Sequence, residues 1–111
     1  MLHVSALAGT TGVVMQGKDV RVLASSIDGR DVDTTRYRHP ARDWTMEYWA
    51  VPETGATVAL SVPAGSHIDL DLAARQPGIP PIPGVTIPPR PPYVVPSQTG
   101  DVTIVHRQLR F

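Results

Sequence analysis

His67, Asp69 and Asp71 are the residues whose types and spacing come nearest to a metal site. They stand at alternate positions in one segment, and imidazole and carboxylate groups are common ligands of divalent cations. Each residue of an extended strand rises about 3.3 Å, so the outermost two side chains lie roughly 13 Å apart and cannot share one ion. We therefore predict a polar, solvent-facing side of a strand, and a domain that holds no metal or other cofactor.

Catalytic motifs are missing from the chain. The four histidines are scattered and belong to no HExxH pattern, and GxSxG, P-loop and GxGxxG sequences do not occur. The absence of cysteine removes thiolate nucleophiles and thiolate zinc sites. We expect a protein that is not itself an enzyme.

A basic cluster with an aromatic residue is the one feature that suggests nucleic-acid binding. Its members are Arg36, Tyr37, Arg38, His39 and Arg42. Asp31, Asp33 and Asp43 flank the cluster, and ten Lys plus Arg balance ten Asp plus Glu over the whole chain. Without a net field to attract phosphates, we predict an exposed solvated loop and no nucleic-acid partner.

Aromatic side chains offer a second kind of binding site. Trp49 is predicted on the outward face of its strand, and Tyr93 and Arg90 lie in a Pro-rich stretch. Aromatic platforms of this kind stack against sugars in sandwich-type modules, although such a Trp more often covers the rim of its own core. These three residues are the candidate ligand or partner contacts.

Apolar residues that alternate with polar ones dominate the chain, which favours strands over helices. Strands are predicted at 2–7, 12–16, 20–25, 44–49, 57–62, 67–73 and 102–111. Hairpins are expected at residues 8–11, at Asp28–Gly29 and at residues 51–55, because Gly, Pro and Asp favour turns there. The predicted core anchors are Trp44, Tyr48, Leu60, Leu70 and Phe111.

Proline is concentrated in one segment, since nine of the twelve prolines fall between Pro77 and Pro96. Proline cannot donate a ladder hydrogen bond, so no central strand runs here. Interleaved Ile, Val and Tyr residues exceed what a solvated linker carries, and we expect an ordered loop at about 74–98 that packs across the sandwich.

These elements predict one all-β domain over residues 1–111. About seven or eight short strands joined by turns indicate an antiparallel sandwich of immunoglobulin-like or jelly-roll type. No apolar run approaches the roughly 20 residues that span a bilayer, and the first residues lack the pattern of a signal peptide. A chain that opens in a strand suggests excision from a longer protein.

Two strings resemble the C-terminal domain of bacterial membrane-anchored zinc peptidases of the M28 family. The first is WTMEYWAVPETGATVALSV from Trp44 to Val62, and the second is QPGIPPIPGVTIPPRPPYVVPSQTGDVTIVHRQLRF from Gln76 to Phe111. The Ser26–Gly29 turn also falls where that family tends to place a Val-Asn-Gly turn. The resemblance extends from about Val20 to Phe111, with Ile79 standing where the family has Leu.

The resemblance implies a noncatalytic accessory domain on the extracytoplasmic side of the membrane. In that family a di-zinc catalytic domain comes first, transmembrane helices follow and the sandwich closes the chain. The zinc ligands belong to the catalytic domain, and no position here matches them. The expected partners are the catalytic and membrane portions of a parent protein. The alternative is a free-standing carbohydrate-binding module that uses Trp49 and Tyr93.

Overall fold

The computed structural model describes residues 1–33, 43–95 and 100–111 and contains eight strands in those ranges. The strands are β1 (Leu2–Val4), β2 (Gly12–Gly17), β3 (Ala24–Ile27), β4 (Arg30–Asp31), β5 (Trp44–Trp49), β6 (Ala56–Ser61), β7 (Asp69–Pro77) and β8 (Val102–Arg110). Every pairing is antiparallel. The prediction of an all-β antiparallel sandwich is confirmed.

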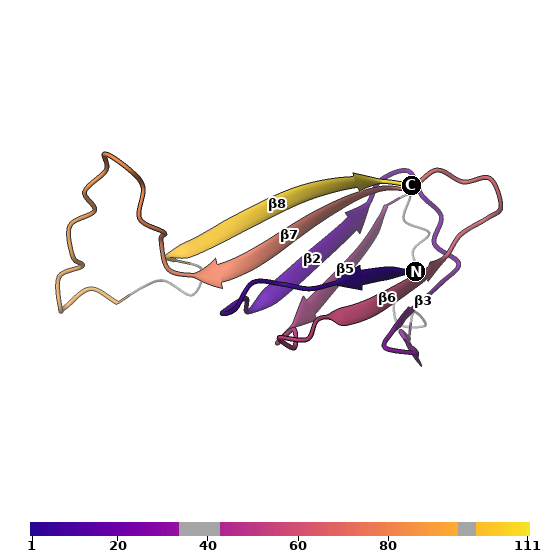
Figure 1. Cartoon of the computed structure of the whole chain (residues 1–111), viewed down its shortest axis with the longest axis horizontal. Helices are drawn as coiled ribbons and strands as arrows, with labels where there is room; N and C mark the ends of the chain where they lie inside the picture. The colour runs from indigo at the N-terminus through magenta and orange to yellow at the C-terminus, as the bar shows by residue number, and fades with distance from the viewer. Residues whose placement is uncertain (34–42, 96–99) are drawn as a thin grey trace.

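Two four-stranded sheets make up the sandwich (Figure 1). Sheet A has the order β1-β6-β3-β4, and sheet B has the order β5-β2-β7-β8. Among the strands of the described ranges, the edge strands are therefore β1 and β4 in one sheet and β5 and β8 in the other. The longest pairing joins β7 to β8, from Asp69 opposite Arg110 to Pro77 opposite Val102.

The core lies between β2, β5 and β6. Val13, Met15, Met46 and Val58 form its buried cluster. Met15 stands in register with Met46 on one side and Leu72 on the other, so three apolar residues cross sheet B in one row. Alternation along each strand puts these side chains on the same face, which explains why the period of two in the sequence locates them.

The predicted core anchors differ in how deeply they are buried. Leu70 is buried, whereas Trp44, Tyr48 and Leu60 are half-buried. The prediction that Phe111 is buried is wrong, because 58% of its surface remains exposed. Phe111 follows the edge strand β8 and lies at one end of a groove beside β1, with Leu2 on the other side.

The turn at Asp28–Gly29 forms as predicted. Asp28 and Gly29 have φ values of 49° and 76°, the left-handed conformations that a type I′ hairpin requires. The Asp28 carboxylate also accepts a hydrogen bond of 2.7 Å from the Thr57 backbone N–H. This bond ties the β3–β4 hairpin to the neighbouring strand β6.

The other two predicted hairpins are wrong. Residues 8–11 connect β1 in sheet A to β2 in sheet B, and the turn after β5 likewise leads from sheet B to β6 in sheet A. In both cases the chain crosses between sheets. Alternation identifies a strand and its faces but says nothing about which strand it pairs with, so it does not separate a hairpin from a crossover.

The Pro-rich segment, as far as it is described (through residue 95), does not pack across the sandwich, contrary to prediction. Strand β7 continues through Pro77, so the loop begins at Gly78 rather than near residue 74. Its described part projects beyond the ends of β7 and β8 (Figure 1). We call residues 78–95 the arm. The projection gives a Cα radius of gyration of 17.0 Å, against about 13 Å for a compact chain of this length.

Candidate functional site

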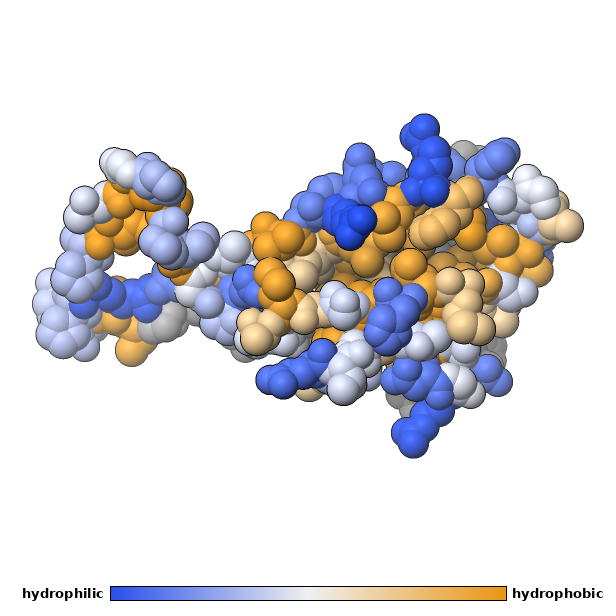
Figure 2. All heavy atoms as spheres, in the orientation of Figure 1, coloured by the Kyte–Doolittle hydropathy of each residue, from blue (hydrophilic) through white to orange (hydrophobic). Residues whose placement is uncertain are grey.

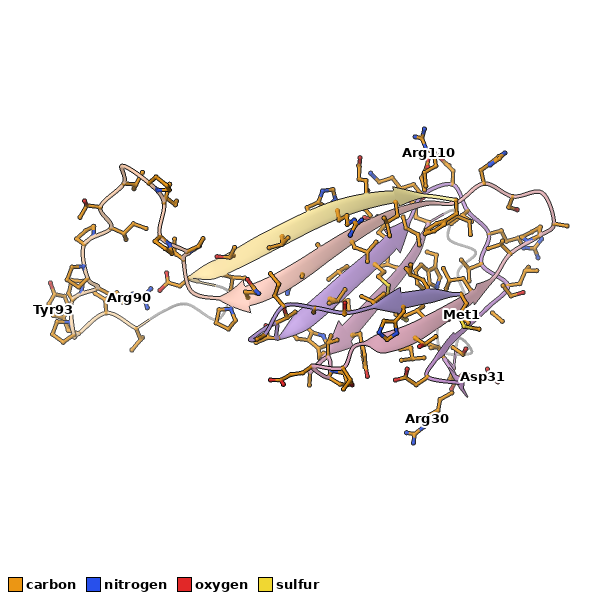
Figure 3. The ribbon with its side chains drawn as sticks, viewed as in Figure 1. Met1, Arg30, Asp31, Arg90, Tyr93 and Arg110 are labelled. Carbon is orange, nitrogen blue, oxygen red and sulfur yellow. The ribbon has the colours of Figure 1, made fainter. Side chains whose placement is uncertain are left out.

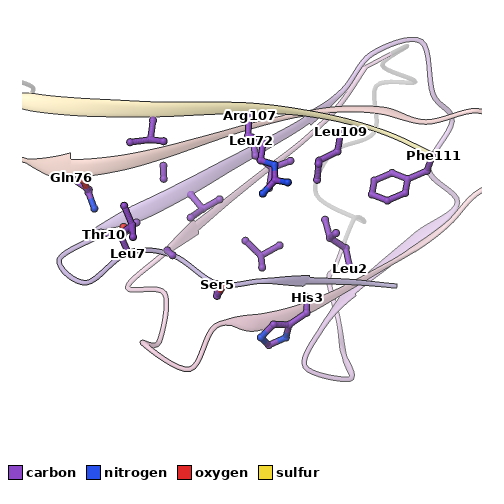
Figure 4. A pocket seen from close by; sticks show the side chains of 15 residues that line it. Leu2, His3, Ser5, Leu7, Thr10, Leu72, Gln76, Arg107, Leu109 and Phe111 are labelled. Atoms are coloured by element: carbon purple, nitrogen blue, oxygen red, sulfur yellow. The ribbon is translucent and has the colours of Figure 1, made fainter.

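An apolar groove lies between β1 and the inner face of β7 and β8 (Figure 4). Its volume is about 530 Å³, within the range of ligand and peptide sites. Sheet A contributes β1 and the segment that follows it. Sheet B contributes alternate residues of its last two strands, Leu72 and Ala74 from β7 and Val105, Arg107 and Leu109 from β8.

The groove exists because the two sheets are offset. The buried cluster belongs to β2, β5 and β6, whereas Val105 on the same inner face of sheet B retains 46% of its exposure. Figure 2 shows apolar residues gathered over this face of the sandwich, with polar residues around them. A contiguous apolar surface with a polar rim is typical of an interaction site.

Arg107 is the cationic side chain of the groove (Figure 4). It stands opposite Leu72 in the β7–β8 register, with Val105 and Leu109 on the same face of its strand. Within the described part of the chain its guanidinium has no hydrogen bond or ion pair. An unpaired guanidinium beside apolar walls favours a ligand that carries an anionic group.

The other cations near β8 are already paired on the opposite face of sheet B. Arg110 donates to Asp69 at 2.7 Å, and Asp71 lies 3.2 Å from Lys18 and 3.6 Å from His106. A hydrogen bond from Gln108, one from Lys18 and the charges of Lys18 and His106 lower the pKa of Asp71 below 3.8. Asp71 therefore stays ionised and belongs to a surface ion-pair network.

Asp69 and Asp71 of the His67–Asp71 series both take part in this network. Asp69 forms an ion pair with Arg110 of β8, and Asp71 forms one with Lys18, which follows β2. In the described ranges no group of three or more His, Asp or Glu side chains is placed to hold a metal ion.

Trp49 lies on the outward face of β5, as predicted, and remains 53% exposed. Its six-membered ring covers Gly12 of β2, where an added Cβ atom would lie 3.0 Å from the ring. The guanidinium of Arg75 from β7 sits over the ring at 5.5 Å from its centroid, a cation–π contact. Trp49 therefore packs across three strands, and a sugar stacking on it would have to displace Arg75.

Tyr93 and Arg90 lie on the arm, away from the sheets (Figure 3). Tyr93 is 85% exposed. Arg90 forms an ion pair with Asp101 just before β8, and the Thr103 hydroxyl donates to the Gly78 carbonyl at 2.6 Å. These bonds hold the base of the arm together. The arm itself displays apolar side chains, among them Ile79, Ile82, Val85, Ile87 and Val95.

The structure does not bring the three predicted contact residues together. Trp49 lies on sheet B, and the other two lie on the arm. The predicted basic cluster at residues 36–42 lies outside the described residues, as does the end of the Pro-rich stretch at 96–98.

Sequence reasoning missed the groove. Its signal is the alternating series Val105, Arg107, Leu109 and Phe111 in the strand predicted at 102–111, of which only Phe111 is predicted as a core anchor. An arginine in the middle of an apolar face is costly to bury without a partner, and it marks a face that opens to solvent.

No protein-family model, no curated protein and no solved structure matches the chain. A helix of the length and apolarity that a membrane crossing requires does not occur among the described residues.

Proposed function

We propose that this chain is a noncatalytic β-sandwich domain that functions by binding another protein segment. The observation that carries the proposal is the arm, which projects from the β7–β8 hairpin and exposes Tyr93, Val95 and several Ile and Val side chains. Exposed apolar side chains of this number on one projection favour a protein contact. The bonds at the arm's base reduce the conformational entropy that such a contact would cost.

The proposed setting is the C-terminal, extracytoplasmic part of a membrane-anchored zinc peptidase of the M28 type, with the catalytic and membrane portions as partners. The support is the resemblance of Trp44–Val62 and Gln76–Phe111 to that domain. The reading frame upstream of Met1 in the source DNA tests this setting. We expect a zinc-peptidase domain followed by membrane helices; a stop codon and a promoter there would contradict it.

The arm's role is tested in the parent protein by replacing its two most exposed large side chains. Tyr93→Ser and Val95→Ser together remove apolar contact area without touching the sandwich. We expect crosslinking of the domain to the rest of the protein to fall at least about thirtyfold, which corresponds to the loss of about 2 kcal/mol at a single hot spot. Leu23→Ser, which alters an exposed leucine on the sandwich, is the matched control. Equal crosslinking in all three proteins would contradict the proposal.

A further inference from the structure

Strand β1 ends sheet A and has a free edge. On one side it pairs with β6, from Leu2 opposite Val58 to Val4 opposite Ala56. No strand of the described chain pairs with its other side. Beyond β1, the backbone groups of Ser5 and Ala6 make no hydrogen bond within the chain as described. Unpaired edge backbone is a template for the addition of another strand.

The free edge of β1 borders the groove. Val4 and Ala6 point inward and pack against the core, and Leu2 lines the groove beside them (Figure 4). A strand added beside β1 would continue sheet A over the inner faces of β7 and β8. Its inward side chains would then contact Val105, which remains exposed, and Leu72 and Leu109, which are half-buried.

Arg107 fixes the chemistry of such a strand. Its guanidinium points into the groove (Figure 4) and has no partner among residues 1–33, 43–95 and 100–111, whereas the carboxylates of Asp69 and Asp71 are paired on the other face of sheet B. Among the residues that line the groove, none carries a carboxylate side chain. The incoming strand must therefore supply the negative charge, and a charge-assisted hydrogen bond to Arg107 would orient it.

We infer that the groove binds an extended segment of a partner protein, which adds to sheet A beside β1. The segment has apolar residues at alternate positions and one Asp or Glu on the same face, directed at Arg107. Residues 2–6 offer an edge of about 13 Å, enough for about five residues of the guest. This inference deepens the proposed binding role but rests on a surface other than the arm.

A second copy of this chain fits the groove less well. Self-addition through β1 would insert residues 1–7, which contain no Asp or Glu. Self-pairing through β8 would align His106, Arg107 and Arg110 of both copies along one junction, and like charges across a strand pair are destabilising. Charge therefore favours a different protein.

The test uses blocked seven-residue synthetic peptides that alternate valine and threonine, with glutamate in place of the central valine. Titration of the whole chain is expected to show binding below about 1 mM. A peptide with lysine in place of glutamate should bind at least about tenfold more weakly. A peptide N-methylated at alternate residues should also lose binding, because it cannot form the ladder.

Reversing the charge at Arg107 and on the peptide tests whether the two groups contact each other. Arg107→Glu should bind the glutamate peptide about tenfold more weakly than the wild type does, and the lysine peptide about tenfold more tightly. Arg110→Glu, on the opposite face of the same strand, is the matched control and should keep the wild-type preference. Rescue by exchanged charges is a result that a merely structural role for Arg107 would not produce.

Several outcomes would overturn the inference. Three concern binding: the glutamate peptide does not bind at about 1 mM, the N-methylated peptide binds equally well, or dodecanoate binds saturably and displaces the peptide. The fourth is a dimer, mediated by β1 or β8, in sedimentation equilibrium. The arm variants Tyr93→Ser and Val95→Ser should bind the peptide normally, so a failure of the groove is distinguishable from a failure of the arm's role.

Discussion

At the residue scale, Gly55 and Gly65 share a backbone conformation but not an environment. Both have φ near +80°, a region that costs other residues about 1–2 kcal/mol. A Cβ atom on Gly55 would lie 2.6 Å from the Val4 carbonyl oxygen, whereas one on Gly65 would meet nothing within 4 Å. Gly55 therefore permits the turn before β6 to approach β1, and it supports one wall of the groove.

This comparison predicts two different losses of stability. Gly65→Ala should lower the free energy of unfolding by about 1 kcal/mol, the cost of the backbone conformation alone. Gly55→Ala should cost at least about 1 kcal/mol more, because the Val4 backbone must also move. Urea unfolding of both variants measures the difference. Equal losses of unfolding free energy in the two variants would show that there is room for a Cβ atom between Gly55 and the Val4 backbone.

Asp71 makes stability depend on pH. Its hydrogen bonds to Gln108 and Lys18 lower its pKa in the folded protein, so its contribution is present above about pH 4 and is lost as pH falls through the folded pKa. In Asp71→Asn, unfolding should be less sensitive to acid between about pH 5 and pH 2.5. Urea titrations at the two pH values measure this sensitivity. Equal acid sensitivity in variant and wild type would contradict the assignment.

At the scale of elements, the alternating pattern predicted strand faces well and strand partners poorly. Met46 faces the core and Trp49 faces out, as the period of two requires. The same pattern did not reveal that the chain crosses to the other sheet after β1 and again after β5. The choice of pairing partner depends on the path of the loop and on packing between distant strands. It also did not reveal that part of the inner face of β8 stays exposed. The alternation of apolar and polar residues is the same whether or not a second sheet packs against that face.

The arm is an element that adds surface without supporting the core. Replacing residues 80–98 with two glycines keeps the bond of Thr103 to Gly78, loses the partly exposed Arg90–Asp101 ion pair, and removes none of the buried cluster. The free energy of unfolding should change by about 1 kcal/mol or less, because a shorter loop closes at slightly lower entropic cost. Urea unfolding checks this, and a loss of several kcal/mol would show that the arm packs on the sandwich.

At the scale of the whole molecule, two features depart from a closed sandwich. The arm extends the long axis to 53 Å, against 29 and 27 Å for the other two, and the offset of sheet A leaves an apolar groove beside a free strand edge. Composition and charge excluded a net electrostatic attraction to nucleic acid, but neither feature follows from composition. The groove arises from how the strands are ordered and the arm from the long connection between β7 and β8, and these are the two separate surfaces that we propose for protein contact.

Hydrogen–deuterium exchange at β1, with and without the glutamate peptide, tests the central claim most directly. Strand addition forms new backbone hydrogen bonds at alternate residues of 2–6, those whose N–H points away from β6, so exchange at these residues should slow when the peptide binds. Arg107→Glu should abolish the slowing with this peptide and restore it with the lysine peptide. Unchanged exchange in residues 2–6 under saturating peptide would contradict the account.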